Sequence, residues 1–303
     1  MTAISATNLT KHYGDVKAVR GIDLAVEAGS IHGFVGPNGA GKSTTMEMLV
    51  GLVTPTVGEA HVAGEPAGSQ AALAAVGFAP QDPVFYESMT GRSYLRYVAA
   101  LADVEGSRSE RVAELLDWLD LADAAGEAVS GYSGGMRRRL GLAQAMVHEP
   151  AVLILDEPTA ELDPQGRVAI IDTLADLAEA GTTVFVSSHI LAELEQFVDA
   201  VTVINDGRIV TAGSLDAIRD TVAEAYVVES TDDAALEGRL AEVPSVEGVE
   251  RGDSGLQVRV EDRDAFEHAL PSVLAEAGVG LRALRRDTGL EEAFLDMVEE
   301  GGD

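Results

Sequence analysis

Two hydrophobic patterns alternate along the first two thirds of the chain. Short apolar runs, typical of strands buried on both faces, each precede a stretch with apolar residues three or four positions apart. The runs span residues 31–36, 151–158 and 182–188. The stretches that follow them predict helices over about residues 42–51, 165–181 and 189–198. Because strands and helices alternate, we expect an α/β fold with a mostly parallel core sheet surrounded by helices.

Other parts of this region follow different patterns. Residues 4–13 and 21–29 alternate or bunch apolar residues between turn residues, as the short strands of an antiparallel β subdomain do. Residues 91–125 show helical spacing, with apolar residues at 112, 115, 116 and 119. We therefore expect a helical subdomain over about residues 85–150.

The pattern restarts at about residue 222. Strand, helix, two strands, helix, strand and a last helix at 289–300 follow in that order. This order predicts a small C-terminal α+β unit of ferredoxin-like type. We therefore expect two domains, residues 1–220 and residues 222–303.

Charge is the most unusual feature of the composition. The 303 residues include 51 Asp and Glu against 21 Lys and Arg, a net charge of −30. Such acidity argues against nucleic acid as a partner, and we hypothesise a surface adapted to high salt in a halophilic source. The chain has no cysteine, no apolar run of about 18 residues and no signal-peptide pattern. We expect a cytoplasmic protein without disulfides or thiolate metal sites.

One glycine-rich loop carries a specific chemical signal. The stretch GPNGAGKS, residues 36–43, follows a predicted strand and opens a predicted helix. Glycines in such a loop let backbone N–H groups turn toward phosphate oxygens, and the helix N-terminus adds partial positive charge. Lys42 can then bridge terminal phosphates, and the Ser43 hydroxyl can bind Mg²⁺. The loop predicts a site for a nucleotide triphosphate.

Two further stretches have the chemistry that such a site needs. Asp156 and Glu157 follow a buried strand, so they would lie at the C-terminal edge of the sheet, where ligands gather in such folds. One carboxylate can bind Mg²⁺, and the other can orient and deprotonate an attacking water. The stretch YSGGM, residues 132–136, has the features of a second phosphate-binding motif, because a serine and two glycines precede a predicted helix.

Over residues 1 to about 220 the chain resembles the nucleotide-binding subunit of an ABC transporter, of the P-loop NTPase fold. The resemblance rests on six motifs in the family's order, and it implies ATP and Mg²⁺ as cofactors. Tyr13 would stack on adenine. The Walker A loop would bind ATP through Gly36, Pro37, Asn38, Gly39, Ala40, Gly41, Lys42, Ser43 and Thr44.

The same resemblance implies metal, catalytic and assembly roles. Mg²⁺ would be bound by Ser43, Gln81 of the Q-loop and Asp156 of Walker B. Glu157 would be the catalytic carboxylate, acting with Lys42 and with the switch histidine, His189. The signature residues Ser133, Gly134 and Gly135 would contact the ATP of a partner protomer, close to Asp163 of the D-loop.

Several positions depart from the family's usual pattern. Tyr132 and Met136 replace the Leu and Gln of the signature, as in the branch that pairs with type-2 ABC exporter permeases. Because the backbone and the helix dipole carry the phosphate contact, we expect that these two positions can vary. Glu161 replaces a small residue of the D-loop, and its charge can oppose a second nucleotide. The arginines at 137–139 are expected to pair with nearby acids on a solvent face.

The resemblance implies an ATPase that works as a homodimer or heterodimer, with two ATP molecules sandwiched between protomers. A separate transmembrane permease would be its partner, would hold it at the inner face of the membrane and would export the cargo. Residues 82–100 would receive the permease, although core packing explains their aromatics equally well. The C-terminal unit resembles a tail of the same exporter branch and suggests no catalysis.

Two other functions stay open at this level. A soluble ABC ATPase of translation or DNA repair is opposed by the single Walker A motif and by the lack of sustained heptads before the signature. The hypothesis of a non-hydrolysing regulatory subunit rests on Glu161, because its charge in the D-loop could oppose the closing of the dimer.

Overall fold

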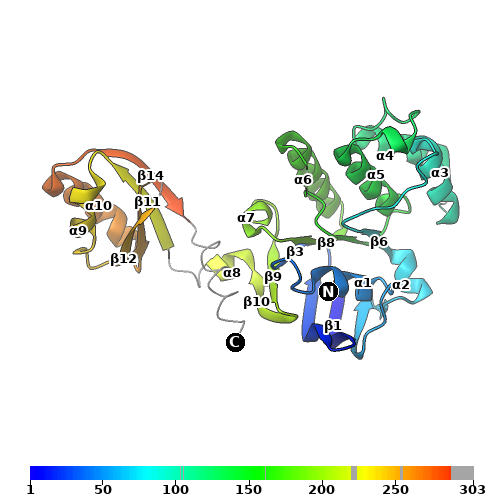
Figure 1. The fold of residues 1–303 in the computed structure, drawn as a ribbon, viewed down its shortest axis with the longest axis horizontal. Helices are drawn as coiled ribbons and strands as arrows, with labels where there is room; N and C mark the ends of the chain where they lie inside the picture. Colours follow the sequence, from blue (N-terminus) through cyan, green and yellow to red (C-terminus); the bar gives the residue numbers. More distant parts are fainter. Residues whose placement is uncertain (103, 105, 161, 220–223, 253–254, 288–303) are drawn as a thin grey trace. The chain divides into compact units, whose positions relative to one another are not determined.

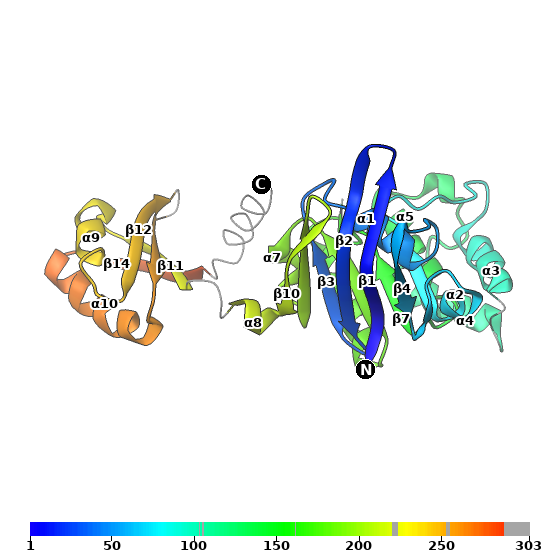
Figure 2. The same ribbon diagram turned by 90° about the horizontal axis from the view of Figure 1, so that it is seen from below.

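The computed structural model describes residues 1–287, apart from residues 103, 105, 161, 220–223 and 253–254. Glu161 and the helix predicted at 289–300 lie outside the described residues. The chain divides at about residue 215 into two compact units, and each is described by itself (Figures 1 and 2). Within the part of the chain described here, no helix has the length and apolarity to cross a bilayer.

A six-stranded sheet forms the centre of the first unit. Its order is β10-β9-β3-β8-β7-β6, and all neighbours are parallel except the edge pair β10 and β9. Every residue of β3, β7 and β8 is buried, which explains why these segments read as runs rather than as alternating patterns. The predicted parallel core is thus confirmed. The strands are β3 (Ile31–Val35), β6 (Val76–Ala79), β7 (Val152–Leu155), β8 (Thr183–Ser188), β9 (Ala200–Asn205) and β10 (Arg208–Ser214).

Both faces of this sheet are covered. Figure 1 shows α6 (Pro164–Glu179) and α7 (Leu191–Leu194) on one face. On the other face, α1 (Lys42–Leu49) and a second sheet share one hydrophobic cluster with Phe34 and Phe185 of the core sheet. Helix α7 is shorter than the predicted 189–198, because the chain turns after Leu194 to enter β9. The short helix α8 (Leu215–Arg219) follows β10.

The second sheet is antiparallel, with the order β2-β1-β4-β5. Buried and exposed residues alternate over residues 22–27 of β2, as in a strand with one face on the core and one in solvent, whereas irregularities in the pairing of β1 with β2 interrupt the alternation in β1. Its strands are β1 (Thr2–Tyr13), β2 (Val16–Glu27), β4 (Val57–Val62) and β5 (Glu65–Pro66), and α2 (Gln70–Ala75) leads from β5 to β6.

Three helices form the predicted helical subdomain. They are α3 (Gly91–Leu101), α4 (Arg108–Trp118) and α5 (Gly134–Met146), with a 3₁₀ turn at Val129–Gly131. Each begins after a hydroxyl residue, Thr90, Ser107 or Ser133, whose Oγ accepts a backbone N–H three positions on. The apolar positions predicted for α4 are all buried. On α5 the apolar residues Leu140, Ala143 and Met146 are buried, whereas Met136 in the first turn is only half-buried.

The second unit has the ferredoxin-like order that the sequence predicts. Its antiparallel sheet has the order β12-β13-β11-β14, and the helices α9 and α10 pack against one face in a single cluster around Tyr226 and Phe266. The elements are β11 (Glu224–Ser230), α9 (Asp233–Leu240), β12 (Val246–Gly252), β13 (Gly255–Val260), α10 (Arg263–Ala277) and β14 (Leu281–Asp287).

Candidate functional site

The loop between β3 and α1 requires glycine at two positions. Gly41 has a φ of 106°, and a Cβ there would lie 2.5 Å from the backbone oxygen of Ala18. At Gly36 a Cβ would lie 2.2 Å from the backbone oxygen of Ile204. The loop is therefore pressed against β2 and β9, while Asn38, Gly39 and Ser43 are exposed on its outer side.

Lys42 turns inward from the start of α1. Its Nζ donates to the backbone oxygens of Gly36 at 2.6 Å and Pro37 at 3.3 Å, and lies 3.4 Å from Glu157 Oε1. Its side chain is only 5% exposed. A buried ammonium survives when it is hydrogen-bonded and paired, so these contacts hold a positive charge beneath the glycine loop.

Asp156 and Glu157 are buried just beyond the end of β7 and are joined by Ser187 of β8. The Ser187 hydroxyl donates to Asp156 Oδ1 at 2.6 Å, and the backbone N–H of Glu157 donates to Ser187 Oγ at 2.9 Å. Glu157 has a φ of 48°, a strained backbone conformation for a non-glycine residue. Sequence reasoning did not find Ser187, because a polar residue at a strand end carries no signal of its partners.

His189 completes a line of contacts across the sheet edge. Its Nδ1 lies 3.1 Å from Glu157 Oε2, and its side chain is 42% exposed. The structure thus joins the lysine of the glycine loop, the carboxylate after β7 and the histidine after β8 through one carboxyl group.

The oxygen donors predicted for Mg²⁺ are of the right chemistry. Ser43 offers an exposed hydroxyl, Gln81 an exposed amide and Asp156 a buried carboxylate, and such hard oxygen ligands suit Mg²⁺. The residues that the structure describes contain no cluster of three or more His, Cys, Asp or Glu side chains suited to a metal. A cation here would therefore need the hydroxyl and amide oxygens as well.

Tyr13 and Thr44, two further residues predicted to bind ATP, differ in exposure. Tyr13 ends β1 and is 48% exposed, with Lys11 Nζ 5.0 Å from its ring centroid. Thr44 is half-buried in the first turn of α1. An exposed aromatic ring is suitable for stacking on a base, and that role of Tyr13 stays a prediction.

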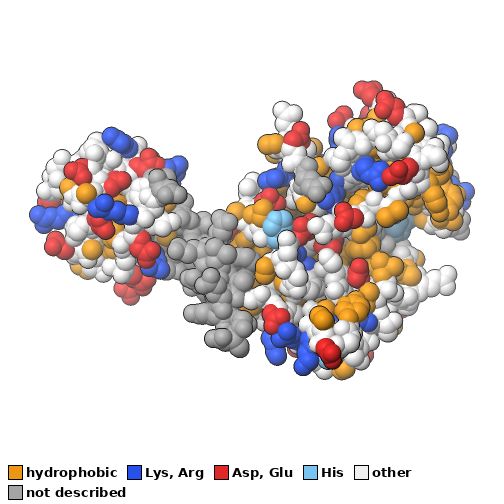
Figure 3. All heavy atoms as spheres, in the orientation of Figure 1, with side chains coloured by type: hydrophobic (Ala, Val, Ile, Leu, Met, Phe, Trp, Pro, Cys, Tyr) orange, Lys and Arg blue, Asp and Glu red, His pale blue; other side chains and the backbone are white. Residues whose placement is uncertain are grey.

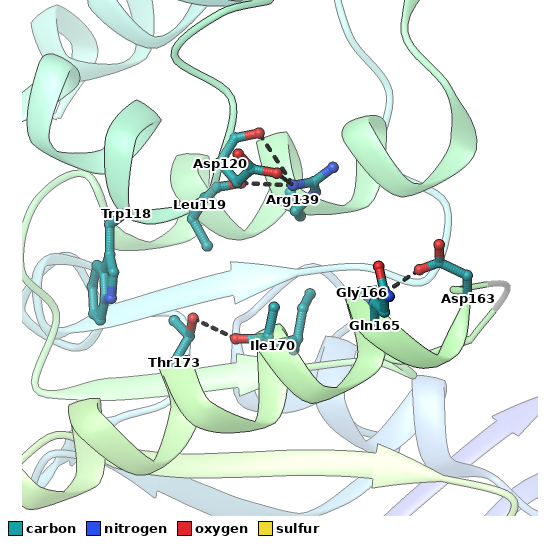
Figure 4. A pocket seen from close by; sticks show the side chains of 10 residues that line it. Trp118, Leu119, Asp120, Arg139, Asp163, Gln165, Gly166, Ile170 and Thr173 are labelled. Carbon is teal, nitrogen blue, oxygen red and sulfur yellow. Dashed lines mark hydrogen bonds and ion pairs between the residues drawn. The ribbon is translucent and has the colours of Figure 1, made fainter.

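The YSGGM stretch opens α5 with exposed polar atoms. Ser133 Oγ accepts the backbone N–H of Met136 at 3.2 Å, and both Ser133 and Gly134 are exposed. A Cβ on Gly135 would lie 3.4 Å from a side-chain carbon of Leu162, so this stretch lies against the D-loop. Asp163 Oδ1 accepts the N–H of Gly166 at 2.8 Å and caps α6 (Figure 4).

Tyr132 has a packing role that the sequence did not predict. The side chain is buried, its hydroxyl donates to the backbone oxygen of Ala124 at 2.9 Å, and burial raises its pKa. A Cβ on Gly91 would lie 2.1 Å from the Tyr132 hydroxyl oxygen, so the tyrosine fits only beside a glycine. Tyr132 therefore fixes the start of the signature to the start of α3.

The aromatic residues after Gln81 divide between core and surface. Phe85 and Tyr94 are buried and meet edge to face with ring centroids 5.2 Å apart. Tyr86 and Tyr97 are exposed and also meet edge to face, at 5.6 Å. Packing thus explains two of the four, and the other two remain available to a partner.

The arginines after the signature pair with acids, as predicted. Arg137 lies 3.2 Å from Glu87, and Arg139 lies 2.9 Å from Asp120. Arg138 instead donates to the backbone oxygen of Gln81. The three arginines therefore do not form a free basic patch.

Comparison with known proteins identifies the family. Residues 19–160 match the family model described as ABC transporter. The daunorubicin resistance ATP-binding protein DrrA3 of Streptomyces coeruleorubidus is 37% identical over 304 residues, covering 98% of this chain and 96% of the relative. The chain belongs to the ABC transporter family. It is an ATP-binding subunit of an ABC transporter, and the assignment of its glycine loop, acidic pair and YSGGM stretch to the family's nucleotide-binding motifs stays a prediction.

Two further ABC proteins extend this likeness. The Nod factor export ATP-binding protein I of Burkholderia orbicola is 36% identical over 303 residues, covering 97% of this chain and 96% of the relative. A solved dimeric bacterial ABC transporter cassette is 25% identical with a TM-score of 0.65, and the match covers 70% of this chain and 98% of that one. These similarities favour a transport ATPase over an ATPase of translation or DNA repair.

Proposed function

We propose that this ABC ATPase powers export through a separate membrane permease, working as one of a pair of ATP-binding subunits. The observation that carries the proposal is the buried carboxyl of Glu157, which lies 3.4 Å from Lys42 Nζ and 3.1 Å from His189 Nδ1. The names of the two relatives, which denote drug resistance and Nod factor export, support export as the direction.

Each residue at the sheet edge has a chemical role in this proposal. The loop of residues 36–44 binds the phosphates through backbone N–H groups, and Lys42 neutralises their charge. Glu157 orients and deprotonates the attacking water, and His189 hydrogen-bonds the terminal phosphate and Glu157. Ser43, Gln81 and Asp156 would hold Mg²⁺, which supplies charge neutralisation on the phosphates.

The signature supports an assembly of two subunits. Ser133 and Gly134 are exposed at the N-terminus of α5, where backbone N–H groups and the helix dipole favour an anion. The chain's own phosphate loop is Walker A, so the signature is free to meet the ATP of a second subunit. The dimeric state of the solved cassette supports this arrangement.

An exposed apolar surface supports a permease partner. Figure 3 shows hydrophobic side chains gathered over the part of the unit that holds α3. Val84, Tyr86, Tyr97 and Leu101 are all between 40% and 87% exposed. Clustered exposed aromatic and aliphatic side chains are typical of protein interfaces. Docking there would place the protein at the inner face of the membrane, with residues 1–220 as the ATPase domain and residues 222–303 as an accessory domain.

ATP hydrolysis and dimer formation test the proposal together. Glu157→Gln should abolish ATPase activity in high-salt buffer and should trap a dimer with MgATP in size-exclusion chromatography, because ATP binds but is not hydrolysed. Adding Ser133→Arg should abolish that dimer. The matched control is Ser107→Arg, since Ser107 is also an exposed helix cap but lies on α4. A Ser133→Arg protein that still dimerises, or a wild-type protein without ATPase activity, would contradict the proposal.

A further inference from the structure

The arginines that follow the signature contact three separate parts of the protein. Successive residues of a helix are turned by about 100°, so Arg137, Arg138 and Arg139 leave the start of α5 in three directions. Arg137 reaches the loop before α3, Arg138 reaches the Q-loop and Arg139 reaches the end of α4. The helix that begins at the signature is thus held at three points close to Ser133.

Arg138 makes the contact that bears on the nucleotide. It donates to the backbone oxygen of Gln81, two residues beyond the end of β6. The residue that ends β6, Ala79, accepts the backbone N–H of Asp156 at 2.9 Å. One short segment therefore touches Walker B at Ala79 and the signature helix at Gln81.

The contact is tight enough to transmit a displacement. A Cβ on Gly141 of α5 would lie 3.3 Å from the side chain of Pro83, so helix and Q-loop already touch one turn beyond the arginine. Arg137 adds a second tie, with Glu87 at 3.2 Å and the Phe85 ring centroid at 5.2 Å. A close-packed contact of this kind leaves little room for the Q-loop to move without α5.

We propose that Arg138 is a positioning residue that couples the two nucleotide sites of the dimer. It joins Gln81, which belongs to the nucleotide site of its own protomer, to the helix whose first turn presents Ser133 to the nucleotide of the partner. When ATP binds at one site and draws Gln81 inward, Arg138 carries that displacement to α5. The signature at the start of α5 is thereby positioned at the other site. This inference rests on the proposed function, from which it takes the dimer and the role of the signature.

Arg139 provides a natural control, because its contacts are those of a structural cap. Its Nη1 bonds the backbone oxygens of Leu119 and Asp120 at 3.2 and 3.1 Å and the Asp120 carboxylate at 2.9 Å, at the end of α4 (Figure 4). These contacts face a cavity of about 400 Å³ between α4, α5 and α6. Loss of Arg139 should lower stability without loosening the Q-loop.

The test is the dependence of ATPase rate on ATP concentration in the full chain. Coupled sites predict a Hill coefficient above 1 for the wild-type protein. Arg138→Ala should bring the coefficient close to 1 and raise the half-saturating ATP concentration on the order of tenfold, the size of a typical coupling between sites. Arg138→Lys, which keeps a cationic donor, should restore much of the coefficient, and Arg139→Ala should leave it at the wild-type value while lowering the melting temperature.

Dimer formation separates this inference from the proposed function. If the Glu157→Gln protein dimerises with MgATP but the wild-type Hill coefficient is 1, coupling is absent and the inference fails alone. It also fails if Arg138→Ala and Arg138→Gln, both folded by circular dichroism, keep the wild-type coefficient. A protein that never dimerises overturns both proposals.

Discussion

Removing the Ser187 hydroxyl tests whether the Walker B acids depend on the neighbouring strand for their position. Ser187 is fully buried, donates to Asp156 Oδ1 at 2.6 Å and accepts the N–H of Glu157 at 2.9 Å. In Ser187→Ala the carboxylate of Asp156 loses a donor, and the N–H of Glu157 loses its acceptor at a place that water does not reach.

The expected magnitude follows from these two bonds. A hydrogen bond to a charged group contributes about 1.5–3 kcal/mol, and a buried N–H left without a partner costs about 1–3 kcal/mol. Ser187→Ala removes the one hydroxyl that makes both hydrogen bonds, and the remaining methyl group can make neither. The variant should therefore lose about 2–4 kcal/mol of folding free energy. If half of that loss, about 1–2 kcal/mol, is felt where Glu157 orients the water, kcat should fall about 5- to 30-fold, since each 1.4 kcal/mol is a factor of ten.

The assay compares kcat with the binding of ATP. ATPase rates at saturating ATP should fall, while the Kd of a fluorescent ATP analogue should change less than about threefold, because the Ser187 hydroxyl bonds Asp156 and Glu157 rather than a residue of the glycine loop. The matched control is Ser230→Ala in the second unit. Ser230 is also buried, donates to the Asp233 carboxylate at 2.7 Å and accepts the N–H of Asp232 at 3.2 Å. That control should lower stability but keep kcat. Equal kcat values for Ser187→Ala and the wild-type protein would refute the reasoning.

Three further predictions test other parts of the molecule. Gly91→Ala should lower the melting temperature, because the new Cβ would lie 2.1 Å from the Tyr132 hydroxyl oxygen. Adding Tyr132→Phe should relieve most of that loss. Additive losses of melting temperature would show that the two sites are independent. His32 is buried against Phe185 and bonds Thr202 Oγ1 at 2.8 Å, and burial lowers its pKa from 6.5 to about 4. The unfolded chain therefore takes up this proton first, so stability falls as the pH falls from 6.5 toward 4. Between pH 7.5 and 5 the wild-type protein should lose about 2 kcal/mol more than His32→Gln in urea unfolding, and equal losses would contradict the burial argument. Finally, the net charge of −30 predicts that melting temperature rises with KCl, and a maximum at low salt would argue against the halophilic hypothesis.

The sequence by itself predicted the features that depend on local patterns. Buried strands of the parallel sheet are apolar runs such as residues 152–155, and the glycine-rich loop after the first of them predicts a phosphate site. Asp156 and Glu157 could be placed at the sheet edge because the carboxyl ends of parallel strands meet there. The ferredoxin-like order of the second unit followed in the same way from periodicity.

Only the tertiary structure decided which distant residues meet. Ser187 joins the Walker B acids from a strand about thirty positions away, Tyr132 fits beside Gly91, and Arg138 reaches the backbone of Gln81. None of these pairs has a sequence signal, because a contact between remote residues depends on how helices and strands pack and not on their own spacing. Periodicity predicts which face of a helix or strand a residue occupies. The packing of the assembled sheet and helices determines which residues it contacts.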